Sequence, residues 1–187
     1  MSVGITLGGY DVDSRETALI DVNFQSNGQP VKFGEGETVS CGGTELKPYI
    51  GSFETAFSRA AIEGRTMACL YAYGQQSAPF SFQVPLGLAI LSPHDREAVA
   101  ASQLTVVSYR SAPAKLPFVV ALAPNAKVWA RPEATTSTRA TLDTSALRGV
   151  GSISMTQQNI SLEIQGQGFQ STSGNFQSMT MVAVTWI

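Results

Sequence analysis

Short runs of alternating apolar and polar residues recur along the chain, and this pattern limits the fold more than any other feature. The clearest runs cover residues 18–24, 66–73, 80–84, 104–109, 153–155, 160–164 and 179–186. Alternation with period two places every second side chain on one face of a β-strand. Turn-forming pairs such as Asn27-Gly28 and Gly42-Gly43 separate the runs. Many short strands with frequent turns predict an all-β sandwich or barrel.

Composition narrows the class of function. Only 14% of the 187 residues are charged, and the formal net charge is −2. A protein that binds nucleic acid through its phosphates needs an excess of basic residues, which this chain lacks. No apolar run approaches the ~18 residues of a membrane-spanning helix. Because so few residues are charged, serine, threonine and glutamine supply most of the polar surface, as is common in secreted β-proteins.

A domain boundary is predicted near residue 86. A strand-like run ends at Pro85, where the missing N–H of proline is tolerated. A new apolar run then begins and leads through the turn at 94–96 to another strand-like run. The resulting segments, residues 1–86 and 87–187, are both close to the ~100 residues of an immunoglobulin-like sandwich.

Two stretches carry a resemblance to a known family. Residues 90–109 read I-L-S-P-H-D-R-E-A-V-A-A-S-Q-L-T-V-V-S-Y, which resembles the opening of a bacterial immunoglobulin-like domain. Residues 28–46, G-Q-P-V-K-F-G-E-G-E-T-V-S-C-G-G-T-E-L, are similar to the paired hairpins of related surface modules. The resemblance implies two tandem immunoglobulin-like β-sandwich domains of a cell-surface protein, over 1–86 and 87–187.

The two cysteines, Cys41 and Cys69, allow one disulfide with one connectivity. Both lie in strand-like surroundings, so we expect a bridge between neighbouring strands, with two buried free thiols as the alternative. A disulfide favours an oxidising, extracellular compartment. The sequence has no recognisable leader and ends within a strand pattern, which favours a segment taken from a longer surface protein.

The sequence offers little for catalysis. His94, the single histidine, lies in a predicted turn beside Pro93 and Asp95, and turn chemistry accounts for it. No nucleophile elbow, zinc-binding helix motif, Cys-x-x-Cys pair or phosphate-binding loop is present. Asp11 and Asp13 have the alternate spacing that calcium ligands use, but a solvated turn explains them better. We therefore expect no enzyme activity, no cofactor and no metal.

Three aromatic residues are candidates for ligand contact. Tyr71 and Tyr73 share one face of a predicted strand by period two, close to Gln75 and Gln76. Trp129 lies in a separate apolar run. Aromatic and amide side chains on one face suit stacking on sugars, but the same residues also fit an ordinary half-buried sheet. Both interpretations stay open.

The last segment of the chain is almost uncharged. From residue 149 to residue 187 the only charged side chain is Glu163. Exposed strand edges are usually protected by charge or proline. Either these strands lie inside their sheets, or an edge is covered by a partner or a second copy.

These features favour a non-enzymatic structural or adhesive module at the cell surface or outside the cell. Its partner would be another protein or copies of itself, bound through strand edges, with no nucleic acid and no membrane insertion in this segment. A self-assembling subunit of a fibre or capsid is the first alternative. A carbohydrate-binding module that uses Tyr71, Tyr73 or Trp129 is the second.

Overall fold

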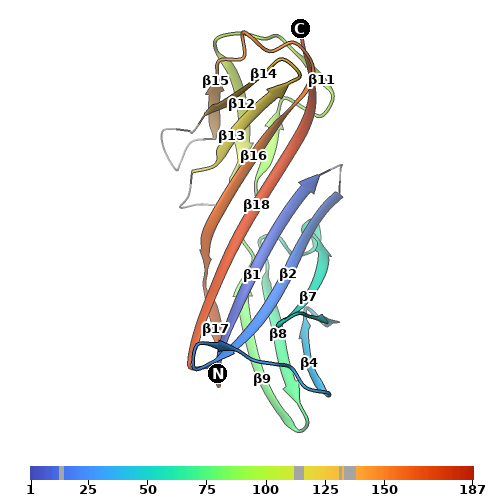
Figure 1. Cartoon of the computed structure of the whole chain (residues 1–187), viewed down its shortest axis with the longest axis vertical. Coiled ribbons are helices and arrows are strands. Elements are labelled where there is room, and N and C mark those ends of the chain that lie inside the picture. The colour runs from blue at the N-terminus through green and yellow to red at the C-terminus, as the bar shows by residue number, and fades with distance from the viewer. Residues whose placement is uncertain (13–14, 112–115, 131, 133–137) are drawn as a thin grey trace. The chain divides into compact units, whose positions relative to one another are not determined.

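A computed structural model describes residues 1–12, 15–111, 116–130, 132 and 138–187 (Figure 1). Nearly all of its regular structure is β-strand, so the predicted all-β class is confirmed. Contacts within the chain define two compact units. Unit 1 comprises residues 1–9, 16–85 and 161–176, and unit 2 comprises residues 10–15, 86–160 and 177–187.

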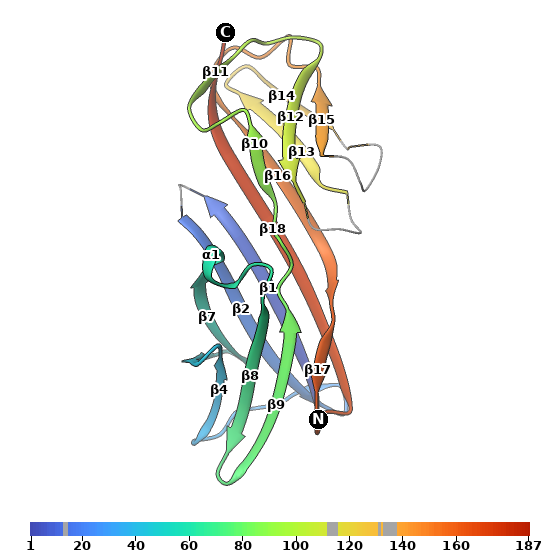
Figure 2. The ribbon, with the colours of Figure 1, turned by 180° about the vertical axis from the view of Figure 1, so that it is seen from behind.

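Unit 1 is built from two groups of strands. In the first, β1 (Ser2–Val12), β2 (Arg15–Ser26), β7 (Ser52–Ser58) and β6 (Lys47–Tyr49) follow one another, and the short β3 (Gln29–Pro30) also pairs with β2. In the second, the order is β17 (Ile164–Gly166), β9 (Gln76–Gln83), β8 (Thr66–Tyr73), β4 (Glu37–Cys41) and β5 (Thr44–Glu45) (Figure 2). One helical turn, α1 (Arg59–Ile62), connects β7 to β8.

The alternation in the sequence sets the two faces of these strands. Along β2, Ala18, Ile20, Val22 and Phe24 are buried, and the residues between them are not. Phe24 is the aromatic centre of the unit 1 core, because four rings lie within 6.5 Å of its centroid. They belong to Phe33, Tyr71, Phe80 and Phe169. The Asn27-Gly28 turn has positive φ at both residues, as the predicted hairpin requires.

The predicted disulfide between Cys41 and Cys69 is confirmed. The two residues lie directly opposite each other on the antiparallel strands β4 and β8, with 4.1 Å between their Cα atoms. The bridge therefore joins neighbouring strands of one sheet. Both half-cystines are buried, so the bridge is part of the unit 1 core.

Unit 2 also has two groups of strands. The first runs β14 (Ala126–Ala130), β13 (Phe118–Ala123), β16 (Gly149–Leu162) and β18 (Ser171–Trp186), with β11 (Glu97–Val99) parallel to β18. The second consists of β10 (Ala89–Ser92), β12 (Thr105–Arg110) and β15 (Arg139–Leu142). Strands β1, β2, β16 and β18 contribute residues to both units.

The core of unit 2 is a separate cluster of buried side chains. Its largest members are Trp186 and Tyr109, both less than 3% exposed. The indole N–H of Trp186 donates to the carbonyl of Leu122 at 2.9 Å, which satisfies its polar atom inside the core. Trp186 thus lies in the unit 2 core near the end of β18.

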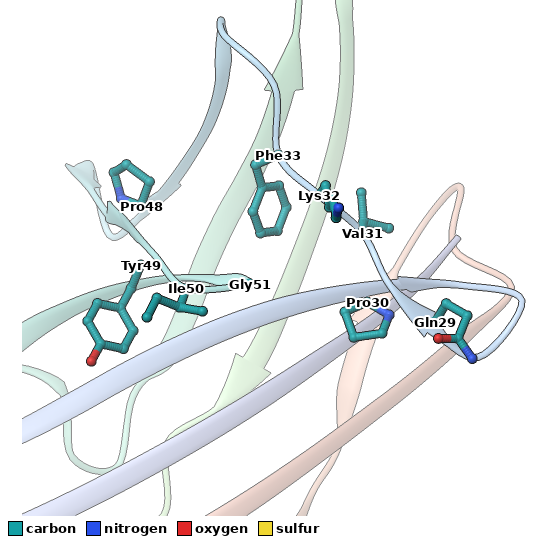
Figure 3. A pocket seen from close by; sticks show the side chains of 9 residues that line it. All are labelled: Gln29, Pro30, Val31, Lys32, Phe33, Pro48, Tyr49, Ile50 and Gly51. Carbon is teal, nitrogen blue, oxygen red and sulfur yellow. The ribbon is translucent and has the colours of Figure 1, made fainter.

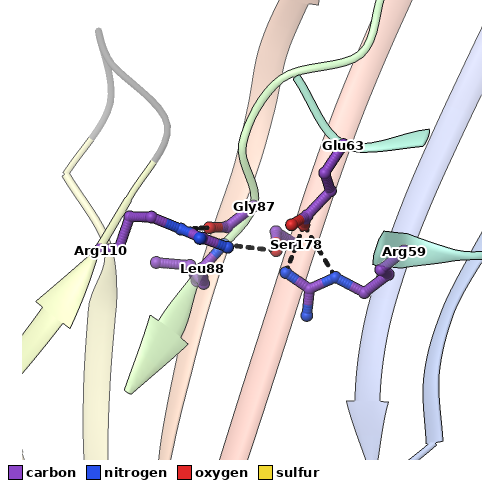
Figure 4. Close-up of polar contacts among 6 residues, drawn as sticks. All are labelled: Arg59, Glu63, Gly87, Leu88, Arg110 and Ser178. Carbon is purple, nitrogen blue, oxygen red and sulfur yellow. Dashed lines mark hydrogen bonds and ion pairs between the residues drawn. The ribbon is translucent and has the colours of Figure 1, made fainter. Parts of the chain in front are cut away.

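Polar contacts hold backbone and side chains in place within each unit (Figure 4). In unit 1, the Arg59 guanidinium donates to the Glu63 carboxylate, with Nε 2.9 Å from Oε1. In unit 2, the backbone N–H of Leu88 donates to Ser178 Oγ at 2.8 Å. Arg110 Nε donates to the Gly87 carbonyl at 3.4 Å, so residues 87 and 88 are fixed where the chain enters unit 2.

The uncharged final segment has a simple structural explanation. Strand β16 lies between β13 and β18, and β18 lies between β16 and β1. Residues 152–156 of β16 pair with β13, and β18 has a partner on each side in the sheet order, so these interior stretches need no charged residues to protect an edge. The uncharged β17 (Ile164–Gly166), by contrast, is the end strand of its sheet. Of the two explanations offered by the sequence, the structure supports the interior position for β16 and β18.

The contact units differ from the predicted segments 1–86 and 87–187 in two places. Residues 161–176 belong to unit 1, although they follow most of unit 2 in the sequence, and residues 10–15 belong to unit 2. One boundary between the contact units falls between residues 85 and 86. The division of the chain into two independently folding domains, residues 1–86 and 87–187, stays a prediction.

Candidate binding surface

Tyr71 is used in packing. Its ring lies 4.9 Å from that of Phe24, centroid to centroid, and its hydroxyl donates to Glu37 Oε1 at 2.8 Å. The pKa of Tyr71 is raised to about 12. Partial burial is the largest cause, and the hydrogen bond to Glu37 and the negative charge of that residue add to it. The side chain is therefore held at one end of the unit 1 core, with its hydroxyl already occupied.

Tyr73 lies two residues further along β8 and is 51% exposed. Its partners in the neighbouring strands are Glu37 and Gln76, so one of the two nearby amide residues lies opposite it. Tyr71 and Tyr73 thus share a strand face, but the Phe24 ring partly covers Tyr71 whereas Tyr73 is exposed.

Trp129 is the most exposed of the three predicted aromatic residues, at 64%. It lies on β14, where the side chains of Lys127 and Trp129 are exposed and that of Val128 packs partly buried against the core. One face of the indole stacks on Phe118, with 5.5 Å between centroids and 29° between planes. This support orients the ring while most of its surface stays open to solvent.

A shallow hollow of about 410 Å³ lies beside this ring. Lys127, Val128 and Trp129 line it from β14, and Asp143, Ser145 and Ala146 line it from the loop between β15 and β16. We call it the Trp129 hollow. Its volume falls within the range of ~300–1,000 Å³ typical of small-molecule sites. Its lining combines an aromatic surface, a carboxylate, a hydroxyl and an ammonium group.

The carboxylate of the Trp129 hollow is held in place by its own loop. Asp143 Oδ1 accepts hydrogen bonds from the Ser145 backbone N–H at 3.1 Å and from the Ser145 hydroxyl at 2.6 Å. These two donors lower the pKa of Asp143, because they favour its ionised form. The carboxylate is therefore charged and fixed in one orientation at neutral pH.

Further contacts anchor the same loop on both sides. Thr144 is buried, and its hydroxyl is 2.6 Å from that of Thr105, on the neighbouring strand β12. The Asn125 side chain donates to the Ala146 carbonyl at 2.6 Å and accepts from the Arg148 backbone N–H at 3.2 Å. Since Asn125 lies in the turn that precedes β14, these bonds join the loop to the strand that carries Trp129.

The acidic part of the hollow was not among the candidates predicted from the sequence. Asp143 and Ser145 are separated by one residue, which is the spacing of a local turn in which an Asp side chain accepts from the backbone two residues later. This spacing predicts a turn, but it does not predict which strand lies beside the turn. Strand β14 and strand β15 belong to different sheets, so only tertiary packing brings residues 143–146 next to residue 129, fourteen or more positions earlier.

Unit 1 has a groove of a different kind, with a volume of about 760 Å³ (Figure 3). Residues 48–51 lie on one side of it and residues 29–32 on the other, with the Phe33 ring between them. Tyr49 and Ile50 are strongly exposed at its edge. Its lining is mainly apolar and has no carboxylate, so it lacks the mixture of groups found in the Trp129 hollow.

The structure offers no metal site or membrane helix in the residues it describes. No three His, Cys, Asp or Glu side chains there are grouped in a way that suits a metal ion. No helix in the same ranges is long and apolar enough to span a bilayer. Asp13, one of the two acidic residues weighed as a calcium ligand, lies outside the described residues.

Comparison with known proteins gives a limited result. No family model and no curated protein matches the sequence. Among solved structures, one similar chain is the crystal structure of the FN1–FN3 domains of chicken CNTN1, with 8% sequence identity and a TM-score of 0.25. The match covers 98% of this chain and 66% of that one, so the chain spans just under two thirds of its length. A likeness this slight says nothing about function.

Proposed function

We propose that the protein is a non-enzymatic adhesive and structural module of a cell-surface protein, and that the Trp129 hollow is its contact surface. The exposure of Trp129 on an ordered strand carries this proposal. A large aromatic side chain in such a position loses the benefit of burial, whereas contact surfaces are enriched in tryptophan. The support from Phe118 and the anchored loop keeps the surface in one shape, which lowers the entropic cost of binding.

The disulfide supports the extracellular location. A bond between Cys41 and Cys69 persists in oxidising compartments such as the cell exterior. The two sandwich cores provide a rigid support, because close-packed interiors resist deformation. In this proposal the fold supplies position and stiffness, and the exposed surface supplies recognition.

Adhesion of protein-coated beads tests the proposal. Beads would be passed under flow over wells coated with the outer-surface fraction of cells that produce the protein. We expect retention by the wild type and by Tyr73→Ala, and loss of retention with Trp129→Ala. The matched control is informative because Tyr73 is also an exposed aromatic residue on a strand. Equal retention of all three proteins would contradict the proposal.

Self-assembly is a second candidate, favoured by one observation. Strand β14 is at the end of its sheet, so one of its edges can accept another strand. The native mass, measured by light scattering across a concentration series, separates the two functions. A mass near 19.8 kDa at every concentration supports the adhesive module, whereas large particles or filaments support the assembling subunit.

A further inference from the structure

We propose that the Trp129 hollow binds a neutral pyranose residue of a β-linked polysaccharide. This inference rests on the proposed adhesive function and names the ligand class of the same site. It is argued from three properties of the hollow: an open aromatic face, polar groups that suit sugar hydroxyls, and a shape that is fixed before the ligand arrives.

The aromatic face suits the apolar side of a sugar ring. A pyranose with equatorial hydroxyls presents its axial C–H groups on a flat face, and these groups carry partial positive charge. The face of an indole carries partial negative charge, so the two surfaces attract each other and exclude water. The Trp129 ring has one face on Phe118 and is 64% exposed, which leaves the opposite face open to such a ligand.

The polar groups of the hollow match what a sugar hydroxyl needs. Each hydroxyl both donates and accepts, so it is best bound where acceptors and donors lie close together. Asp143 uses Oδ1 for its own loop, and within the described ranges Oδ2 accepts no hydrogen bond from the protein. Oδ2 is thus an acceptor for a ligand hydroxyl, and the Lys127 ammonium on the neighbouring strand is a donor.

The anchored loop makes these groups ready for binding. Hydrogen bonds from Ser145 fix the Asp143 carboxylate, and Asn125 joins the loop to the turn before β14. A ligand therefore does not have to order the acceptor when it binds, which removes part of the entropic cost. This matters for a shallow site, where each contact is weak.

Other ligand classes fit the hollow less well. The base of a nucleotide could stack on Trp129, but the hollow has one ammonium, from Lys127, and one carboxylate, from Asp143, so its charged side chains offer no excess positive charge to a phosphate. An apolar peptide would leave the carboxylate and ammonium groups without partners. The mainly apolar groove of unit 1 lacks an acceptor of this kind, and its lining gives no reason to expect sugar binding there.

Titration of the whole chain with cellohexaose and with chitohexaose tests the inference. Tryptophan emission is a suitable signal, because Trp186 is only 2% exposed and a ligand at the surface changes the environment of Trp129. We expect a shift of the emission to shorter wavelength with at least one hexasaccharide, and heat release in calorimetry at the same concentrations. AMP, which can stack but has a charged phosphate and no pyranose ring, is expected to give neither signal.

Three variants locate the binding. Trp129→Ala should weaken binding about tenfold or more, as the loss of one stacking contact of ~1.4 kcal/mol requires. Asp143→Asn, which keeps the shape of the side chain but removes its charge, should weaken binding about fivefold. Tyr73→Ala should bind as the wild type does. Far-UV circular dichroism of each variant verifies that it is folded.

The outcomes separate this inference from the proposed function. If neither hexasaccharide binds at millimolar concentration, or if Trp129→Ala binds as the wild type does, the saccharide inference is wrong. If the beads in that case still adhere in a way that depends on Trp129, and protease treatment of the coated wells abolishes adhesion, the Trp129 hollow is still the contact surface and its partner is a protein. If the beads never depend on Trp129, the proposed function fails independently of any sugar.

Discussion

Reduction of the Cys41–Cys69 disulfide tests how far a covalent constraint, and not packing alone, stabilises unit 1. The bridge closes a loop with a sequence separation of 28 residues. The loop-closure relation for a loop of this length gives about 3.6 kcal/mol of stabilisation at 25 °C, through the lower entropy of the unfolded chain. Because the total free energy of unfolding of a typical protein is only ~5–15 kcal/mol, this contribution is a large fraction of the stability of a small domain.

Urea unfolding followed by far-UV circular dichroism measures the effect. The protein is unfolded, reduced with a phosphine and refolded under reducing conditions, since both half-cystines are buried in the native state. With an m-value of about 2 kcal/mol per molar urea, the midpoint should fall by nearly 2 M. The variant C41A/C69A is the control, because the reductant should not change its midpoint.

One result would refute the reasoning. A difference below about 1 kcal/mol between oxidised and reduced protein, with an unchanged m-value, would mean that the loop is already constrained in the unfolded chain. A lower m-value in the oxidised protein would instead support the reasoning, since it reports an unfolded chain that the bridge keeps more compact.

Three further predictions follow from single side chains. In a spectrophotometric titration, Tyr71 should form its phenolate with a pKa of about 12. The folded pKa lies above the ordinary value of 10.0, so this contribution to stability is complete below pH 10 and is lost as the pH rises toward 12. Glu37→Gln should bring that pKa closer to 10, because it removes the charge that opposes the phenolate. Phe24→Ala should lower the free energy of unfolding by about 3–5 kcal/mol in urea titrations, because it leaves a cavity among four rings. Gly151→Ala should lower the free energy of unfolding by about 1–3 kcal/mol and shift the emission of Trp186, since a Cβ there would lie 2.6 Å from the indole nitrogen. An unchanged emission spectrum and an unchanged stability would contradict this close approach.

The sequence predicted those features of the fold that depend on local pattern. Alternation along residues 18–24 correctly placed Ile20, Val22 and Phe24 on the core face, because period two is a property of the strand itself. The disulfide between neighbouring strands was also predictable, since both cysteines lie in strand-like runs with turns between them. These inferences need no knowledge of distant parts of the chain.

The alternating pattern could not predict which strands pair with one another. Ile164 pairs opposite Phe82 on β9, and nothing in the alternating pattern of residues 160–164 distinguishes that partner from any other strand. The same limit applies to the tyrosines. Tyr71 and Tyr73 share a face as predicted, but only the position of the Phe24 ring decides that Tyr71 is covered while Tyr73 is exposed.

The candidate site was predicted in part for a related reason. Trp129 was identified as an aromatic residue of interest, because its residue type suits ligand contact. Its orientation depends on the pairing of Val128 with Ala121, which places residue 128 toward the core and leaves residue 129 on the outer face. Asp143 enters the site through tertiary structure alone, so no local pattern could have identified it.

The composition of unit 1 from three chain segments has a consequence for synthesis. Ile164 completes a sheet begun by residues 37–83, and the Gln170 backbone N–H donates to the Met1 carbonyl at 2.9 Å. Unit 1 therefore begins to emerge from the ribosome first but obtains its last strand after residues 86–160 have been made. At ~5–20 residues per second, the outer edge of β9 waits several seconds for its partner. A newly made chain must pass this interval with an open strand edge, so chaperone demand and errors of pairing should be greatest there.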